Sequence, residues 1–235
     1  MTNRATLYLI PAFLDEASLH VLPPYLLDAI KTCQVFFVEN ERSARRYLKS
    51  LWREMVIDDY EWYTLHKAEE ELRQVFGEKL KAGKTIGLIS EAGCPGIADP
   101  GQLLTDAAHR AGATVVPLVG PSSILLALMA SGLNGQQFRF SGYLPVDAPG
   151  RARSLRELEN DSQARHCTEI FMDTPYRNNQ LFETILQVCR PSTKICIAAN
   201  LTGPMEFIRT RTVAEWKAGP LPDLNKQPTI FCLLA

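Results

Sequence analysis

Two loops of this sequence combine glycine, proline and reactive side chains in a spacing suited to ligand binding. The first, "SEAGCPGIADPG" at residues 90–101, holds Glu91 and Asp99 and follows the apolar run "TIGLI". The second, "VGPSS" at residues 119–123, ends a β-branched run and opens an apolar helical pattern. Glycine lets the backbone approach a ligand closely, and the free amides at a helix start can donate to a carboxylate or a ribose oxygen. The pair of loops therefore predicts a cleft.

The first loop matches known nucleotide-binding patterns only in part. Its Glu-x-Gly-x-x-Gly spacing approaches the dinucleotide fingerprint, but that fingerprint needs an acid at the end of the next strand, and "TVVPLVG" has none. Pro95 removes an amide that would hold a phosphate, and no Gly-Lys-Ser/Thr closes the loop as in a P-loop. Two interpretations of the first loop remain: a plain turn, and a ligand-binding loop of another kind. The loop follows a predicted central strand, and open α/β sheets bind ligands at the carboxyl ends of such strands, which favours the ligand-binding loop.

The elements that must position these loops alternate between apolar strands and amphipathic helices. The first half predicts strands at "TLYLI", "QVFFVEN", "TIGLIS" and "TVVPLVG", with helices over 24–31, 42–51, 67–81 and 102–111. The second half predicts helices over 121–132, 151–160 and 177–189, with strands at "RFSGYLP", "TEIFMDT", "KICIAAN", "FIRTRTV" and "QPTIFCLLA". The order predicts an α/β protein of two domains, 1–118 and 119–235, with a mainly parallel first sheet and a mixed second sheet.

Composition sets broad limits. The 235 residues are 46% hydrophobic and 22% charged, which is ordinary for a globular protein, and the net charge of −1 indicates no overall basic field for nucleic acid. Six cysteines without a Cys-x-x-Cys pair predict reduced core thiols and no metal site. No apolar run is long enough to span a bilayer and no secretory signal is visible, so we expect a soluble, cytoplasmic protein without membrane association.

With the segments that follow them, the two loops resemble the tetrapyrrole (corrin/porphyrin) methylase superfamily of S-adenosylmethionine-dependent methyltransferases. Within it, the sequence is most similar to the bacterial small-subunit ribosomal RNA methyltransferase I group, which 2′-O-methylates a cytidine ribose. The matching residues are Ser90, Ala92, Gly93, Pro95, Ile97, Asp99, Pro100 and Gly101, then Gly120, Pro121 and Ser122, then Ser131, Gly132 and Leu133, and finally Thr174, Pro175, Tyr176 and Arg177. Glu91 stands where the group has Asp.

The resemblance implies an enzyme of two α/β/α domains, usually a homodimer, with the cofactor S-adenosylmethionine in a cleft between the halves and the small ribosomal subunit or its RNA as a partner. It also leaves open methylation of a tetrapyrrole or another small molecule, and a non-catalytic protein that binds S-adenosylmethionine. By position, it implies cofactor contacts from Glu91, Cys94, Ile97, Ser122, Ser123, Met172, Asn200 and Thr229, with Pro228 an alternative to Thr229.

Three segments depart from the group's pattern. "LIPAFLDEASLH" replaces Thr-Pro-Ile-Gly-Asn-Leu, "VENERSARR" replaces Ala-Glu-Asp-Thr-Arg, and "AANLT" replaces Ala-Arg-Glu-Leu-Thr. These segments are expected to face the methyl acceptor, so the cofactor site is retained while the acceptor site is altered. The catalytic base is not identified, and the candidates are Glu39, Glu41, Asp99 and Asp173. Phosphate contacts, or contacts to the carboxylates of a tetrapyrrole, would come from Arg42, Arg45, Arg46, Arg151, Arg153 and Arg156.

Overall fold

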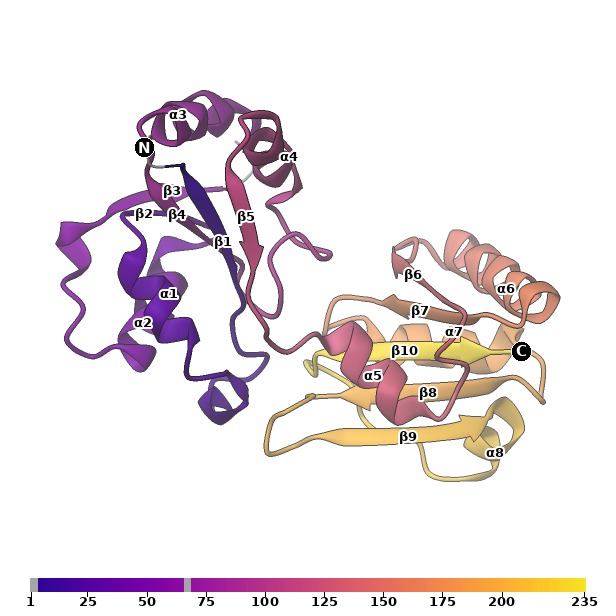
Figure 1. Cartoon of the computed structure of the whole chain (residues 1–235). Helices are drawn as coiled ribbons and strands as arrows, with labels where there is room; N and C mark the ends of the chain where they lie inside the picture. Colours follow the sequence, from indigo (N-terminus) through magenta and orange to yellow (C-terminus); the bar gives the residue numbers. More distant parts are fainter. Residues whose placement is uncertain (1–3, 66–68) are drawn as a thin grey trace. The chain divides into compact units, whose positions relative to one another are not determined.

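The structure is a computed structural model that describes residues 4–65 and 69–235, and it divides into two compact units (Figure 1). The boundary falls between Ser122 and Ser123, whereas the sequence placed it between 118 and 119. The intervening segment belongs to the first unit because Val119 N donates to the Tyr25 hydroxyl at 2.7 Å. Each unit is a sheet covered by helices on both faces.

The sheet of the first unit has five strands in the order β3-β2-β4-β1-β5, and every neighbouring pair is parallel. The strands are β1 (Thr6–Ile10), β2 (Val35–Val38), β3 (Glu61–Thr64), β4 (Thr85–Ile89) and β5 (Thr114–Pro117). The predicted parallel sheet is confirmed. The edge strand β3 was not predicted, because its four residues "EWYT" are only partly buried and form no apolar run.

Alternating side chains of the first sheet serve two separate cores. Phe36 and Val38 pack with α1 (Leu26–Thr32) and α2 (Glu41–Leu51), whereas Phe37 packs with α3 (Glu69–Lys81) and α4 (Gln102–Arg110) on the opposite face. This period of two is the property of a strand buried on both faces. Single 3₁₀ turns lie at Leu19–Val21 and Ile57–Asp59. The expected start of the third helix, Lys67, lies outside the described residues.

The sheet of the second unit is mixed, as predicted. Its order is β6-β7-β10-β8-β9, with β6 parallel to β7 and the other neighbours antiparallel. The strands are β6 (Phe138–Tyr143), β7 (Thr168–Met172), β8 (Lys194–Ala199), β9 (Phe207–Thr212) and β10 (Thr229–Leu234).

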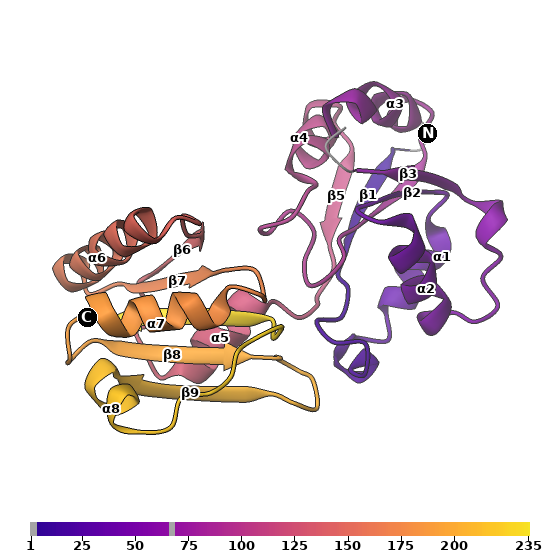
Figure 2. The ribbon, with the colours of Figure 1, turned by 180° about the vertical axis from the view of Figure 1, so that it is seen from behind.

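Helices cover both faces of the second sheet. The helix α5 (Ser123–Ser131) lies on one face, and α6 (Ala148–Arg165), α7 (Asn178–Val188) and α8 (Val213–Ala218) lie on the other, as Figures 1 and 2 show together. The helix α8 was not predicted. It is six residues long and begins with a capping box between Thr212 and Glu215.

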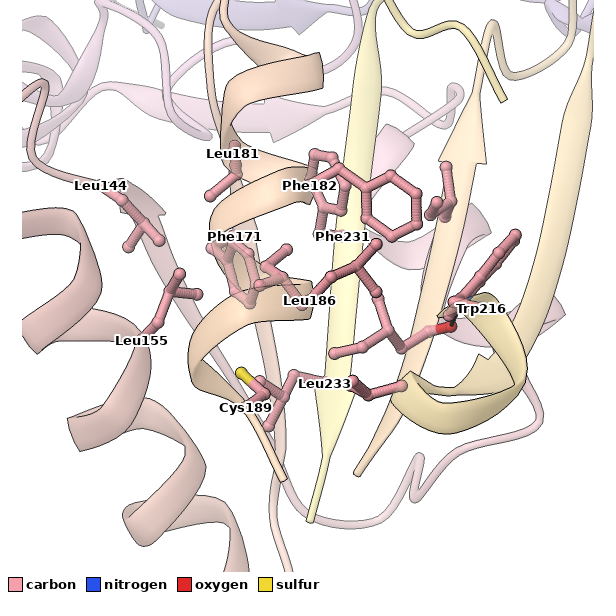
Figure 3. Close-up of a cluster of buried hydrophobic side chains, with 14 of the residues drawn as sticks. Leu144, Leu155, Phe171, Leu181, Phe182, Leu186, Cys189, Trp216, Phe231 and Leu233 are labelled. Carbon is pink, nitrogen blue, oxygen red and sulfur yellow. Dashed lines mark hydrogen bonds between the residues drawn. The ribbon is translucent and has the colours of Figure 1, made fainter. Parts of the chain in front are cut away.

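The core under α6, α7 and α8 combines leucine and isoleucine side chains with a few aromatic rings (Figure 3). Phe171 of β7 and Phe231 of β10 are register partners whose rings stack at 5.9 Å. Phe182 of α7 meets the Trp216 ring edge-on at 5.4 Å, and Trp216 Nε1 donates to Ile195 O at 3.0 Å. Because Trp216 is buried with its one donor satisfied, α8 is held firmly on the sheet.

The cysteines are free thiols, four of them buried and two partly buried: Cys33, Cys189, Cys196, Cys232, Cys94 and Cys167. Within the described residues, no helix combines the length and the apolar character needed to cross a membrane.

Candidate functional site

The carboxyl ends of three neighbouring strands bring distant loops to one edge of the first sheet. The strands β2, β4 and β1 are adjacent and parallel, so the chain leaves each of them at the same edge. Ala12 N, after β1, donates to Gly93 O at 2.8 Å. Glu91 N, after β4, donates to Glu39 Oε2, after β2, at 3.0 Å. The predicted ligand loop therefore lies at the edge where open parallel sheets bind ligands.

The loop 90–101 follows the central strand β4 and contains several left-handed backbone conformations. Gly93 has φ of 68° and Gly101 has φ of 129°, and Ala98, which carries a side chain, has φ of 62°. Left-handed conformations in non-glycine residues cost energy and tend to occur at functional positions. The loop is thus a tightly specified structure rather than a simple reversal of the chain.

Glu91 is held from two directions. Its backbone amide is bound by Glu39, and its carboxylate oxygen Oε1 accepts from Ser43 Oγ at 3.0 Å. Ser43 lies in the first turn of α2, which Asn40 caps by accepting from the amides of Arg42 and Ser43. Within the ranges that the structure describes, no group donates to Glu91 Oε2, so this oxygen is available to a ligand. The sequence analysis did not identify Ser43.

A cavity of about 240 Å³ adjoins Glu91. It is lined by Ala12, Phe13, Glu16, Ser43, Ala44, Arg46, Tyr47, Ser90 and Glu91. Most of these residues belong to the segments after β1 and β2, where the sequence departs from the family pattern. One wall is aromatic, with Phe13 packed edge-on against Tyr47 at 5.4 Å. An exposed ion pair between Arg46 and Glu16, 2.9 Å long, is also part of the lining.

Asp99 is the acid of this loop with a perturbed pKa. Burial, together with the negative charges of Glu39 and Glu91, raises the pKa of Asp99 to about 6, although the hydrogen bond of the Ser90 hydroxyl partly opposes the shift. Burial, and then the charge of Asp99, also raise the pKa of the Cys94 thiol.

The other candidate bases are engaged elsewhere. Glu41 forms an ion pair with Arg45 on α2. The Asp173 oxygen Oδ1 accepts from Thr174 N at 2.7 Å and forms an ion pair with Arg177. Of the candidates on the first sheet, Asp99 is the one whose environment suits proton transfer near neutral pH.

The loop 119–122 docks onto the other loops of the first unit. Cys94 Sγ lies 3.5 Å from Pro121 O and donates to it. A Cβ placed on Gly120 would lie 2.2 Å from the Cβ of Pro11, so this close approach requires glycine. Ile97, in the first loop, is 52% exposed.

The cofactor residues expected from the second unit gather at one edge of its sheet. Met172 ends β7, Asn200 follows β8, and Thr229 begins the antiparallel strand β10 that lies between them. Thr229 pairs with Ala199, and Asn200 N donates to Pro228 O at 2.9 Å. Ser123, also expected, is the first residue of α5. All eight cofactor assignments remain predictions.

One of the suspected phosphate-binding arginines has another role. Arg151 is buried, and its guanidinium donates from Nε to Thr184 Oγ1 at 3.1 Å and from Nη1 to Val146 O at 3.1 Å. Such a side chain does not face a polyanion, so the expectation is wrong for Arg151. Three others are exposed and form no ion pair with any described residue: Arg42, Arg153 and Arg156.

The sequence profile of one protein family, described as tetrapyrrole (corrin/porphyrin) methylases, matches residues 18–217. Relatives named ribosomal RNA small subunit methyltransferase I occur in Vibrio cholerae serotype O1, at 36% identity over 73% of this chain and 59% of that protein, and in Escherichia coli O157:H7, at 34% identity over 70% and 57%. The matches thus span less than two thirds of these relatives. A protein of the same name in Xylella fastidiosa is 27% identical over 100% of this chain and 82% of its own.

Solved structures show the same fold at low sequence identity. The uroporphyrin-III C-methyltransferase of Thermus thermophilus is 18% identical, with a TM-score of 0.57 over 98% of this chain and 92% of that one. The methyltransferase CobJ is 16% identical, with a TM-score of 0.61 over 98% and 93%. Together with the profile match, which covers most of the sequence, these findings show that the chain belongs to the tetrapyrrole (corrin/porphyrin) methylase family.

Proposed function

We propose that the protein is an S-adenosylmethionine-dependent methyltransferase that methylates a ribose 2′-hydroxyl of small-subunit ribosomal RNA. The observation that carries the proposal is the placement of Glu91. It belongs to a strained loop at the carboxyl edge of a parallel sheet, and it borders a cavity formed by the segments that differ from the family. The names of the relatives support the choice of RNA.

The cofactor supplies a methyl group on a sulfonium, which is intrinsically reactive, so the protein's task is mainly alignment. The residues present fit this task. Glu91 offers the unengaged oxygen Oε2, and Ser43 fixes the position of its carboxylate. The left-handed glycines of loop 90–101 allow close approach of a ligand to the backbone. The proposed contacts are those that the resemblance implied: Glu91, Cys94, Ile97 and Ser122 in the first unit, and Ser123, Met172, Asn200 and Thr229 in the second.

The acceptor side is proposed to be the cavity beside Glu91. A ribose hydroxyl is a poor nucleophile unless a base removes its proton or a charge stabilises the developing alkoxide. Asp99, with a pKa raised to about 6, is mostly ionised at neutral pH and still accepts a proton readily. The aromatic wall formed by Phe13 and Tyr47 suits a flat ring. Arg42, exposed and without an ion pair among the described residues, can contact a phosphate.

The test is transfer of a radiolabelled methyl group to small ribosomal subunits from a strain that lacks the gene. We expect the wild type to label the RNA. Glu91→Ala should lower both cofactor affinity and labelling by about tenfold or more, because it removes a charged hydrogen-bond partner. The matched control is Glu54→Ala, an exposed acid beyond the end of α2, which should leave both unchanged.

The other outcomes separate the alternatives. Labelling of a porphyrinogen but not of ribosomal subunits would favour a tetrapyrrole acceptor and contradict the RNA assignment. Tight cofactor binding, measured by calorimetry, with no transfer to any acceptor would favour a non-catalytic binding protein. Absence of cofactor binding by the wild type would overturn the proposal. The resemblance also supports a cytoplasmic homodimer.

A further inference from the structure

Gln227, in the segment between α8 and β10, uses all of its polar groups in hydrogen bonds. Its side-chain Nε2 donates to Asp223 O at 2.7 Å, and its Oε1 accepts from Asn200 Nδ2 at 2.8 Å. Its main-chain O accepts from Asn178 Nδ2 at 2.7 Å and from Thr229 Oγ1 at 2.9 Å, and its N–H also donates within the segment. The residue thus connects the start of α7, the end of β8 and the start of β10.

These contacts fix the orientation of two side-chain amides. A main-chain carbonyl only accepts hydrogen bonds, so Asp223 O fixes which end of the Gln227 amide is Nε2 and leaves Oε1 facing Asn200. Asn200 must therefore present its Nδ2 to Gln227. Its second hydrogen points to another main-chain carbonyl, Met205 O, at 3.3 Å. Both donors of the Asn200 amide are used, and the reversed orientation would place oxygen against oxygen.

The third polar position of the Asn200 amide, its oxygen Oδ1, is available to a ligand. Within residues 4–65 and 69–235, no group donates to Asn200 Oδ1. The backbone of Asn200 is also constrained, with a left-handed φ of 50° and its N–H bound to Pro228 O at 2.9 Å. The residue therefore presents a fixed hydrogen-bond acceptor at the edge of the sheet where Met172 and Thr229 also lie.

We infer that Gln227 is a positioning residue that holds Asn200 Oδ1 as an acceptor, and that Asn200 recognises a hydrogen-bond donor of the cofactor, an N–H or a hydroxyl. The inference rests on the proposed function, which places the cofactor against Asn200. An asparagine side chain that rotated freely could pair with either a donor or an acceptor of the ligand. The fixed amide orientation therefore makes Asn200 selective for a donor. A carboxylate or another acceptor group of the ligand is excluded from this position.

The first test is calorimetric binding of S-adenosylhomocysteine to two variants of Gln227. Gln227→Met has a similar shape but releases the Asn200 amide, and it should weaken binding about fivefold, the value of one net hydrogen bond. Gln227→Glu still offers Asn200 Nδ2 an acceptor, but it loses the donor to Asp223 O. Its affinity should therefore lie between those of the wild type and Gln227→Met. Near-equal binding by Gln227→Met and the wild type would contradict the inference.

A matched control separates positioning from general support of the segment. Asn179 holds the same segment, since its Nδ2 donates to Asp223 Oδ1 at 2.8 Å and its Oδ1 accepts from Leu224 N at 2.7 Å, yet it does not touch Asn200. Asn179→Ala should leave the affinity within about twofold of the wild type, less than one hydrogen bond. An equal loss in Asn179→Ala and Gln227→Met would show a merely structural role.

The second test identifies the donor. Binding is measured with analogues of S-adenosylhomocysteine that each lack one donor: the N6-dimethyl, 2′-deoxy, 3′-deoxy and desamino forms. For one of them the penalty of Gln227→Met should disappear, because the group that Asn200 recognises is already missing. A penalty of the same size with every analogue would overturn the inference.

A measurement without ligand distinguishes the two proposals. In the NMR spectrum of the ligand-free protein, the Asn200 side-chain amide, assigned with Asn200→Asp, should give two well-separated proton signals that shift in Gln227→Met but not in Asn179→Ala. If that signature is present but the wild type does not bind S-adenosylhomocysteine, the proposed function is wrong, and so is the ligand assigned to Asn200. The positioning of Asn200 by Gln227 would still be correct. If the signature is absent, the positioning of Asn200 by Gln227 is itself wrong.

Discussion

At the scale of the residue, Asp99 shows how the site's acids influence one another. Its carboxyl is half-buried, and both burial and the charges of Glu39 and Glu91 raise its pKa to about 6 from an ordinary value of 3.8. The folded protein therefore binds this proton more tightly than the unfolded chain does. Ionisation of Asp99 opposes folding as the pH rises through the interval from 3.8 to 6.

Asp99→Asn removes this pH-dependent cost. We expect the variant to be more stable than the wild type by about 1 kcal/mol at pH 8, a value reduced for the solvent screening of a half-exposed group. The difference should shrink as the pH falls from 6 to 4 and vanish only well below 3.8, where Asp99 is protonated in the unfolded chain as well. Urea unfolding at pH 4, 6 and 8 measures it, with the exposed Asp58→Asn as the control. A variant less stable than the wild type at pH 8 would contradict the assigned pKa.

The residues of the site differ in how far the sequence could identify them. Glu91 is visible because it stands inside a specific run of glycines and prolines after a strand. Ser43 and Gln227 have no such context, since serine in a first helical turn and glutamine before a strand are ordinary. Their roles depend on hydrogen bonds to Glu91 and Asn200, which lie 48 and 27 residues away in the chain. Only the folded structure brings these partners together.

At the scale of the element, the loop 119–122 depends on the loop after β1. Gly120 lies against Pro11 so closely that no side chain fits between them. Val119 and Pro121 bind the Tyr25 hydroxyl and the Cys94 thiol on either side. A change at Gly120 should therefore displace the loop and the adjoining Ser122.

Gly120→Ala is expected to destabilise the first unit by about 2 kcal/mol, the usual cost of overpacking. It should also weaken binding of S-adenosylhomocysteine. Thermal unfolding and calorimetry measure the two effects. The matched control is Gly77→Ala within α3, where no described atom lies within 4 Å of the added Cβ. That change should stabilise the helix by about 1 kcal/mol, and a Gly120→Ala protein as stable as the wild type would contradict the close approach.

Most elements were predictable because burial imposes a period on the sequence. Strands such as β2 and β8 are almost wholly apolar, and α2 begins within one residue of its expected start. The elements that were missed, β3 and α8, are short and lie at sheet margins. Their formation depends on pairing with β2 and on the packing of Trp216, and neither interaction leaves a periodic pattern in the sequence.

At the scale of the whole molecule, the homodimer implied by the resemblance is open to a direct test. In the second unit, α5 leaves Leu125 and Met129, one helical turn apart, exposed at 50% and 78%. Exposed apolar pairs of this kind favour association. Sedimentation equilibrium should give about twice the chain mass of 26.3 kDa. A single-chain mass throughout a micromolar concentration series would contradict the dimer.

The sequence by itself determined the family, the two α/β units and the loop that contains Glu91. These properties follow from local patterns, namely the alternation of strands and helices and the spacing of glycines and prolines. The tertiary structure alone decided that Ser43 holds Glu91, that burial raises the pKa of Asp99, that Arg151 is buried, and that Gln227 orients Asn200. The reason is physical: burial, pKa and amide orientation depend on which distant groups the fold brings within a few ångströms.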